Sequence, residues 1–194
     1  MKLPITGDDY VRAAARLGCH PAAIEAVAAV ESSGSGFNPD DSCKTLFEGH
    51  VFHRFTGGRF DKTHTTLSFP TATREWYGRT WQDEQTRLEI AMSLDQTAAM
   101  LSASWGRFQI MGFNHGACGY ATVQDFVAAM RDSEAKQLEA FVSFIESRHL
   151  ADELRDCRWA DFARLYNGPG YKANRYDEKM ANAYRTALHA RGEA

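Results

Sequence analysis

The sequence predicts an α+β protein that is mostly α-helical, with a small lobe built of loops or a hairpin. Apolar residues recur at helical spacing over most of the 194 residues, and capping patterns precede several of these stretches. Residues 56–81, by contrast, are rich in threonine and glycine and have no clear period. A segment of this length without periodicity is often functional, so we expect it to form the side of a cleft opposite the helices.

Local signals place the helices along the chain. Thr6 and Asp9 have the spacing of a capping box. Pro21 suits a first helical position, because it has no amide hydrogen to leave unpaired. The expected helices are residues 8–17, 21–31, 46–55, 82–94, 95–101, 122–130, 133–149, 159–166 and 175–189. No repeat or low-complexity linker separates them, so residues 1–194 are expected to form a single domain.

Composition bounds the possible functions. Apolar residues make up 44% of the chain and charged residues 24%, which is typical of globular proteins, and the net charge of −3 gives no indication of a nucleic-acid partner. No apolar run approaches the ~20 residues of a membrane span. We also expect no signal peptide, because the N-terminus has neither the apolar region nor the cleavage site of one. The four cysteines form no C-x-x-C pair, so reduced, largely buried thiols and cytoplasmic synthesis are expected.

Glu31 is unusual for its place at the end of the second predicted helix. The apolar residues Ile24, Val27 and Ala28 share one helical face, and Glu31 follows on that face. The serines and glycines of residues 32–36 then end the helix. A carboxylate at a helix C-terminus opposes the macrodipole, and apolar surroundings penalise its ionisation, so both effects raise its pKa. A general acid needs such a pKa, whereas a glutamate that points into water at a fraying helix end would lack it.

Three separated motifs occur in a fixed order. They are ESSGSGFNP at residues 31–39, SASWGRFQIMG at 102–112 and FARLYNGPGY at 162–171. Their order and spacing resemble the lysozyme superfamily, especially soluble lytic transglycosylases and goose-type lysozymes. With LFEGHVFHRF at 46–55 and SWGRFQIMGFNH at 104–115, the chain more closely resembles the N-acetylmuramidase family of phage endolysins over nearly its whole length. The resemblance implies a lysozyme-like catalytic domain that degrades peptidoglycan.

The resemblance also implies roles for single residues. Glu31 matches the catalytic glutamate of the family. Gln109 would offer its amide to N-acetyl or hydroxyl groups of a sugar, and Ser104 is a candidate of the same kind. Tyr166 and Asn167 would face the cleft, with Tyr166 supplying a stacking face and a hydroxyl group. Two alternatives stay open, in which Gln109 is a structural amide that bridges two turns and Tyr166 is a core aromatic residue.

Hydrolysis of a glycosidic bond usually employs two carboxyl groups, which lie closer together in retaining than in inverting enzymes. Glu48 is the favoured partner of Glu31, because it lies in an apolar and aromatic run where a charge is unexpected. The alternative is that Glu48 is an exposed helical residue. Further candidates for the second carboxyl group are Asp40, Asp41 and Asp61. Lytic transglycosylases act with one glutamate, so a missing partner would change the product rather than abolish cleavage.

No motif requires a cofactor. His50 and His53 have H-x-x-H spacing, but a third ligand at a defined spacing is lacking, so no metal site is expected. The chain has no glycine-rich phosphate loop. It also has no nucleophile motif, because Cys118, the best thiol candidate, has no local His–Asp partner.

The combined observations favour a monomeric muramidase whose partner is bacterial peptidoglycan and which hydrolyses the β-1,4 bond between N-acetylmuramic acid and N-acetylglucosamine. A lytic transglycosylase that forms 1,6-anhydro-muramic acid is the alternative among enzymes. A non-catalytic peptidoglycan-binding module is the alternative from another class, and the carboxyl group of Glu31 at an apolar helix end argues against it. By resemblance, such an endolysin waits in the cytoplasm of the infected host and reaches the cell wall after a holin opens the membrane.

Overall fold

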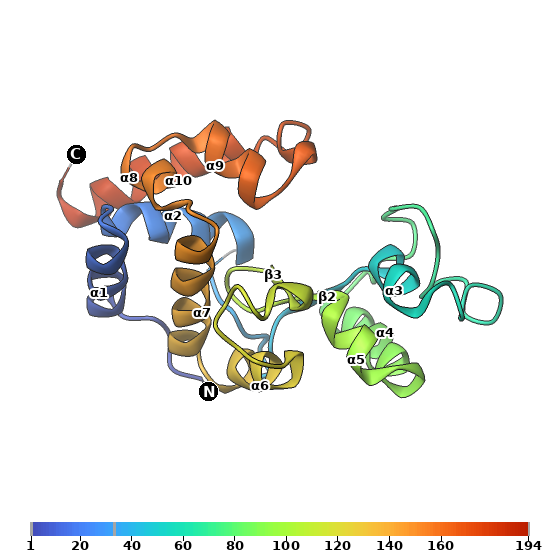
Figure 1. Ribbon diagram of the computed structural model, residues 1–194. Helices are drawn as coiled ribbons and strands as arrows, with labels where there is room; N and C mark the ends of the chain where they lie inside the picture. The colour runs from blue at the N-terminus through green and yellow to red at the C-terminus, as the bar shows by residue number, and fades with distance from the viewer. Residues whose placement is uncertain (1, 33, 194) are drawn as a thin grey trace.

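Helices dominate the computed structural model, which describes residues 2–32 and 34–193 (Figure 1). The α-helices are α1 (Gly7–Leu17), α2 (Pro21–Ser32), α3 (Gly49–Thr56), α4 (Trp81–Leu94), α5 (Gln96–Leu101), α6 (Val123–Asp132), α7 (Glu134–Ser147), α8 (Ala151–Arg155), α9 (Trp159–Tyr166) and α10 (Tyr176–Arg191). Two short 3₁₀ helices are η1 (Gly112–Asn114) and η2 (Pro169–Tyr171). The strands β1 (Thr45–Phe47), β2 (Ala103–Trp105) and β3 (Ile110–Met111) form an antiparallel sheet in that order. The predicted α+β, mostly helical fold class is confirmed.

The helices predicted from capping signals begin close to where the sequence places them. The hydroxyl of Thr6 accepts a hydrogen bond from the Asp9 amide and the Asp9 side chain accepts one from the Thr6 amide, so the capping box forms. Gly18, in the left-handed conformation with φ +66°, ends α1. Helix α2 begins at Pro21. Ser33, one of the residues expected to stop α2, lies outside the described residues.

The sheet is the main difference from the sequence prediction. Strand β1 replaces the first part of the helix expected at 46–55. Helix α3 begins only at Gly49, so Glu48 is the residue that precedes it. The hairpin of β2 and β3 lies within residues 102–112, whereas residues 57–80 consist of turns and irregular chain. Of the two forms expected for the long polar segment, the loop is therefore observed and the hairpin is not. Strands of two or three residues have too few positions for an alternating pattern to be visible.

The helices form two groups on either side of the sheet (Figure 1). In the larger group α10 packs against α2 and α9, and α1 packs against α2 and α7. In the smaller group α4 packs against β1 and α5, and α3 against α5. Helix α2 lies inside the larger group, because its residues Ala22, Ala26 and Val27 are completely buried. Small side chains on α2 let neighbouring helices approach it closely. The C-terminal end of α2 lies at the boundary between the two groups of helices.

The four cysteines are all free, in agreement with the expected reduced thiols. Cys43 and Cys118 are buried, and burial raises the pKa of each thiol to about 12. Neither thiol is therefore a nucleophile near neutral pH. Among the described helices, none has the length and apolar character needed to cross a membrane.

Candidate active site

The carboxyl group of Glu31 faces a cavity at the boundary between the two groups of helices. Glu31 is the second-last residue of α2, and the cavity beside it has a volume of about 410 Å³. The cavity is lined by residues from α2, the turn after it, β1, α4 and the β2–β3 hairpin, namely Glu31, Ser32, Asn38, Pro39, Lys44, Thr45, Trp81 and Gln109. Two of the three sequence motifs, those that contain Glu31 and Gln109, therefore meet in one cavity.

Burial and a single neutral donor determine the acidity of Glu31. The side-chain amide of Asn167 donates a hydrogen bond to Glu31 Oε1 at 2.7 Å. Loss of hydration raises the pKa of Glu31 to about 7, against the smaller lowering effects of the Asn167 hydrogen bond and the charge of Lys179. The sequence prediction of a raised pKa agrees with this value. At neutral pH a substantial fraction of the carboxyl groups therefore holds a proton that it can donate.

Tyr166 is the last residue of α9 and directly precedes Asn167, and its side chain packs against the core. Its ring is stacked on Phe162 with 5.2 Å between centroids, and its edge contacts involve Phe141 and Phe144. Its hydroxyl donates to the carbonyl oxygen of Phe108 at 2.7 Å. Of the two interpretations of Tyr166, this geometry agrees with the core aromatic residue, and it joins α9 to the turn next to Gln109.

The side chain of Gln109 lines the cavity from the turn between β2 and β3. Ser104, which is buried, donates its hydroxyl to Gln109 Oε1 at 2.7 Å, and Gln109 Nε2 donates to the Gly106 carbonyl at 2.8 Å. The backbone of Gln109 has φ +47°, a left-handed conformation that is unusual for a residue with a side chain and that often occurs at functional sites. Gly106 has φ +71°, and a Cβ atom there would lie 2.6 Å from Gln137 Cδ, so this turn requires glycine.

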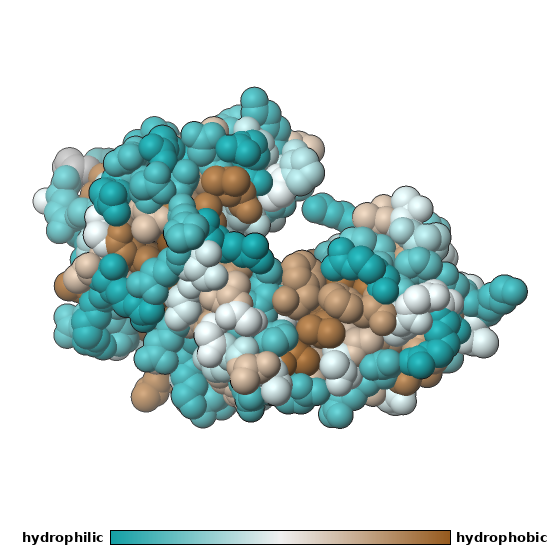
Figure 2. All heavy atoms as spheres, viewed as in Figure 1, coloured by the Kyte–Doolittle hydropathy of each residue, from teal (hydrophilic) through white to brown (hydrophobic). Residues whose placement is uncertain are grey.

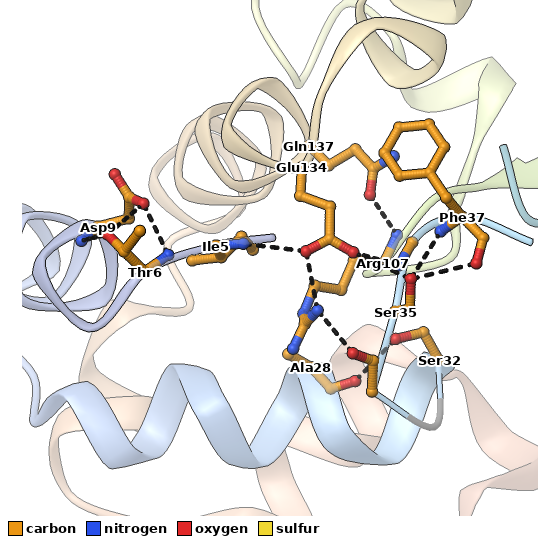
Figure 3. A network of polar contacts seen from close by, with 12 residues as sticks. Ile5, Thr6, Asp9, Ala28, Ser32, Ser35, Phe37, Arg107, Glu134 and Gln137 are labelled. Carbon is orange, nitrogen blue, oxygen red and sulfur yellow. Dashed lines mark hydrogen bonds and ion pairs between the residues drawn. The ribbon is translucent and has the colours of Figure 1, made fainter. Parts of the chain in front are cut away.

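A buried ionic network fixes the segment that follows Glu31 (Figure 3). Glu134, which is only 2% exposed, accepts hydrogen bonds from the amides of Gly36 at 2.6 Å and Ile5 at 3.0 Å. Arg107 forms an ion pair with Glu134 at 2.9 Å and donates to the Gly34 carbonyl at 2.8 Å. The network therefore ties the turn after α2 to the start of α7 and to the β2–β3 turn.

Glu48 lies on the other side of the cleft, immediately before α3. The hydroxyl of Tyr77 lies 2.8 and 2.7 Å from its two carboxylate oxygens, and His50 Nδ1 is 3.3 Å from Oε2. The proximity of this carboxylate and burial both raise the pKa of Tyr77, with burial as the larger cause. Glu48 and Tyr77 line a second cavity of about 470 Å³ together with Asn167, the residue that binds Glu31. Asn167 thus links the surroundings of the two carboxyl groups.

The segment 56–81 borders the cleft, as the sequence predicts. Trp81 lines the cavity of Glu31, and Arg74 and Tyr77 line the cavity of Glu48. Arg74 also donates to Asn174 Oδ1 at 3.4 Å, which is a contact across the cleft. Figure 2 shows the molecule hollowed between the two groups of helices. These residues are absent from the predicted site, although the aromatic residues in a polar segment (EWYGRTW at 75–81) were a signal for them.

The remaining candidate carboxyl groups are engaged elsewhere. Asp40 accepts hydrogen bonds from Ser42, which lower the pKa of its carboxyl group. Asp41 accepts one from the amide of Lys2, and it does not line either cavity beside Glu31 or Glu48. Asp61 accepts from Ser68 and His53, and these contacts lower the pKa of Asp61. Of the four candidates, Glu48 is the one that shares a cavity with Asn167, the residue that binds Glu31.

The histidines of the H-x-x-H sequence have separate carboxylate partners. His50 lies beside Glu48, and His53 Nδ1 is 2.8 Å from Asp61 Oδ2. Within residues 2–32 and 34–193 no group of three or more histidine, cysteine, aspartate or glutamate side chains is arranged to hold a metal ion.

Comparisons with known proteins identify the family of the chain. A family model described as Muramidase (N-acetylmuramidase) matches residues 20–188. The crystal structure of the Burkholderia AP3 phage endolysin superimposes with a TM-score of 0.85 at 39% sequence identity, covering 96% of this chain and 72% of that one. No curated protein sequence matches the chain. The matched residues include α2, the cleft and α10.

Proposed function

The chain belongs to the N-acetylmuramidase family and is a peptidoglycan-degrading muramidase, and we propose that Glu31 is its general acid. The observation that carries this proposal is the position of Glu31, which faces a cavity with a single neutral hydrogen-bond donor and has a pKa raised to about 7. The protonated carboxyl group would donate its proton to the glycosidic oxygen as the bond breaks, and the leaving sugar would depart as an alcohol.

Glu48 is the second carboxyl group of this mechanism. As an anion it would stabilise the positive charge that develops on the sugar ring, and it would either activate a water molecule or form a glycosyl intermediate. Tyr77 supports this role, because its hydroxyl contacts both carboxylate oxygens and so fixes their direction. The bond cleaved is the β-1,4 bond between N-acetylmuramic acid and N-acetylglucosamine.

Gln109 and Asn167 contact the substrate in this proposal, while Ser104 and Tyr166 hold them. Gln109 lines the cavity of Glu31 and has one amide hydrogen beyond the bond to Gly106. Asn167 Oδ1 is buried without a hydrogen-bond partner among the described residues, so a sugar hydroxyl or N-acetyl amide would satisfy it. The unpaired oxygen beside the catalytic carboxyl group supports a polar substrate contact at this position.

Mass spectrometry of digested peptidoglycan tests the proposal. Wild-type protein should release fragments with hydrolysed muramic acid ends, and Glu31→Gln should release almost none. Fragments with 1,6-anhydro-muramic acid as the main product would show a transglycosylase and remove Glu48 from the mechanism. Glu48→Gln should reduce hydrolysis without affecting binding, whereas unchanged turnover would also exclude it. The anomer formed first, followed by proton NMR, distinguishes retention from inversion.

We also propose that residues 1–194 act as a monomeric catalytic domain that reaches the cell wall from the host cytoplasm through a holin. The match to a phage endolysin supports the route, and the packing of α10 against α2 supports the single domain. A single cooperative unfolding transition and a monomer in sedimentation are the expected results. Expression in a bacterial host should cause lysis only together with a holin, and lysis by the protein alone would contradict this route.

A further inference from the structure

A groove along helix α4 adjoins the cavity of Glu31 and shares the lining residue Thr45 with it. The groove has a volume of about 320 Å³, and residues that line it include Ser42, Thr45, Gln85, Glu89, Trp105 and Arg131. Trp81 in the cavity and Gln85 in the groove lie one helical turn apart on the same face of α4. A substrate bound at Glu31 therefore has direct access to this groove.

The groove has a mixed lining, in which the charged side chains are Asp41, Glu89 and Arg131 and the apolar ones include Leu88 and Met92. Trp105 is 1% exposed, its indole N–H donates to the Met100 carbonyl at 3.1 Å, and the guanidinium of Arg131 lies 5.4 Å from its ring centroid. No face of this tryptophan is available for stacking against a pyranose. Arg131 contributes a guanidinium that forms no ion pair within the described residues, and Glu89 and Asp41 contribute carboxylates. A ligand with both carboxylate and ammonium groups would complement these charges.

We propose that this groove, from here on the stem groove, binds the peptide stem that N-acetylmuramic acid carries on its lactyl group. This inference rests on the proposed function, because the stem reaches the groove only when the sugar lies at Glu31. The glycan of a peptide-bearing strand is neutral, because the lactyl carboxyl group forms the amide bond to the stem, whereas the stem carries carboxylates and, in many bacteria, the free amine of a diamino acid. Arg131 binds a stem carboxylate, and Glu89 binds the amine.

The stem groove makes the enzyme prefer glycan strands with peptides. The test compares soluble, uncross-linked strands that retain their peptides with the same strands after an amidase has removed the peptides and the lactyl carboxylates thus released have been converted to neutral methyl amides. Wild-type kcat/KM should be higher on the peptide-bearing strands, through KM. Arg131→Gln should reduce that preference about three- to tenfold, as expected for one charge-assisted hydrogen bond, and leave peptide-free strands unaffected. Arg131→Lys should restore part of the preference, and Arg185→Gln, an exposed arginine on α10, is the matched control.

A second variant tests the same groove without disturbing the contact with Trp105. Glu89 is exposed, so Glu89→Lys should fold normally. It should raise KM for strands whose stems carry a free amine and leave KM unchanged when that amine is acetylated.

Three results would overturn the inference: equal wild-type activity on both kinds of strand, an equal loss on both in Arg131→Gln, or no effect of either substitution. Failure of the proposed function gives a different result, since Glu31→Gln would then cleave peptide-free strands at the wild-type rate.

Discussion

Glu31 and Glu134 each lie at the end of a helix, but their carboxyl groups have different hydrogen-bond partners. Glu31 lies at the C-terminal end of α2, where the macrodipole disfavours an anion, and the described part of the chain offers it one hydrogen-bond donor. Glu134 is the first residue of α7, where the macrodipole favours an anion, and it accepts from two backbone amides, a serine and an arginine.

Glu31 is half-buried and Glu134 is buried, and the different partners give the two carboxyl groups different properties. A carboxylate that is saturated with donors keeps its charge and fixes the elements around it. A carboxyl group that has lost hydration and has one neutral donor has a raised pKa, so near neutral pH it can both gain and lose a proton. Burial alone therefore does not explain the difference between the two glutamates, whereas the number of hydrogen-bond donors around each carboxyl group does.

The largest expected effect is on catalysis by Glu31. Glu31→Gln should lower kcat by about 10²–10⁴-fold, because an amide cannot supply the proton. Turbidity clearing of cell walls and release of soluble muropeptides measure this loss. In the wild-type protein activity should also fall as the pH rises above about 7, where Glu31 loses its proton. Near wild-type clearing by the variant would contradict the assignment.

Replacing the other glutamate should act on stability instead. Glu134→Gln should lower the free energy of unfolding by up to about 3–5 kcal/mol, because Arg107, whose side chain is only 14% exposed, would lose the charge that pairs with it. Urea unfolding measures the change, and Glu139→Gln, an exposed glutamate on the same helix, is the control. The folded fraction should keep more activity than Glu31→Gln does. A variant as stable as the control would show that the ionic network does not stabilise the turn after α2.

The pH dependence of stability sharpens the comparison. The pKa of Glu31 is about 7 in the folded protein against 4.5 for a free side chain, so folding favours its protonated form. The resulting stability is fully present below pH 4.5 and is lost as the pH rises through 7, an effect of up to about 3 kcal/mol. Glu31→Gln should therefore be more stable than the wild type at pH 8 and similar to it at pH 4.5. If the variant and the wild type had equal unfolding free energies at pH 8 as well as at pH 4.5, the raised pKa of Glu31 would be excluded.

The sequence predicts the parts of this fold and site that depend on neighbouring residues. Thr6 with Asp9 forms the expected capping box, and the place of Glu31 at an apolar helix end predicts the direction of its pKa. The contacts that complete the site join distant segments, such as Asn167 with Glu31 across 136 positions, and Tyr77 with Glu48. Local patterns carry no information on such pairs, so only the family resemblance placed Asn167 near the cleft.

Asn167 allows a smaller test of how donors control Glu31. Asn167→Leu removes the hydrogen bond that lowers the pKa of Glu31, so the pKa should rise and the alkaline limit of activity should move to higher pH. Loss of the orienting contact should also reduce kcat by about tenfold, as expected for one hydrogen bond to a charged group. The pH profile of kcat measures both effects, with the exposed Asn182→Ala as control. A shift of the profile to lower pH would contradict this role.

The smallest expected effect concerns Tyr166, the residue that precedes Asn167 and packs into the core. Tyr166→Phe keeps the aromatic stacking on Phe162 but leaves the Phe108 carbonyl without its donor, which should cost about 1–3 kcal/mol of stability. Because the ring contacts remain, Asn167 should stay near Glu31, and kcat should fall only a few-fold with an unchanged pH profile. Urea unfolding and the pH profile of kcat separate this outcome from direct sugar binding, in which KM would rise while stability stayed constant. Tyr171→Phe, which removes a hydroxyl without a hydrogen bond to another described residue, is the control, because it measures the loss of a phenol group alone.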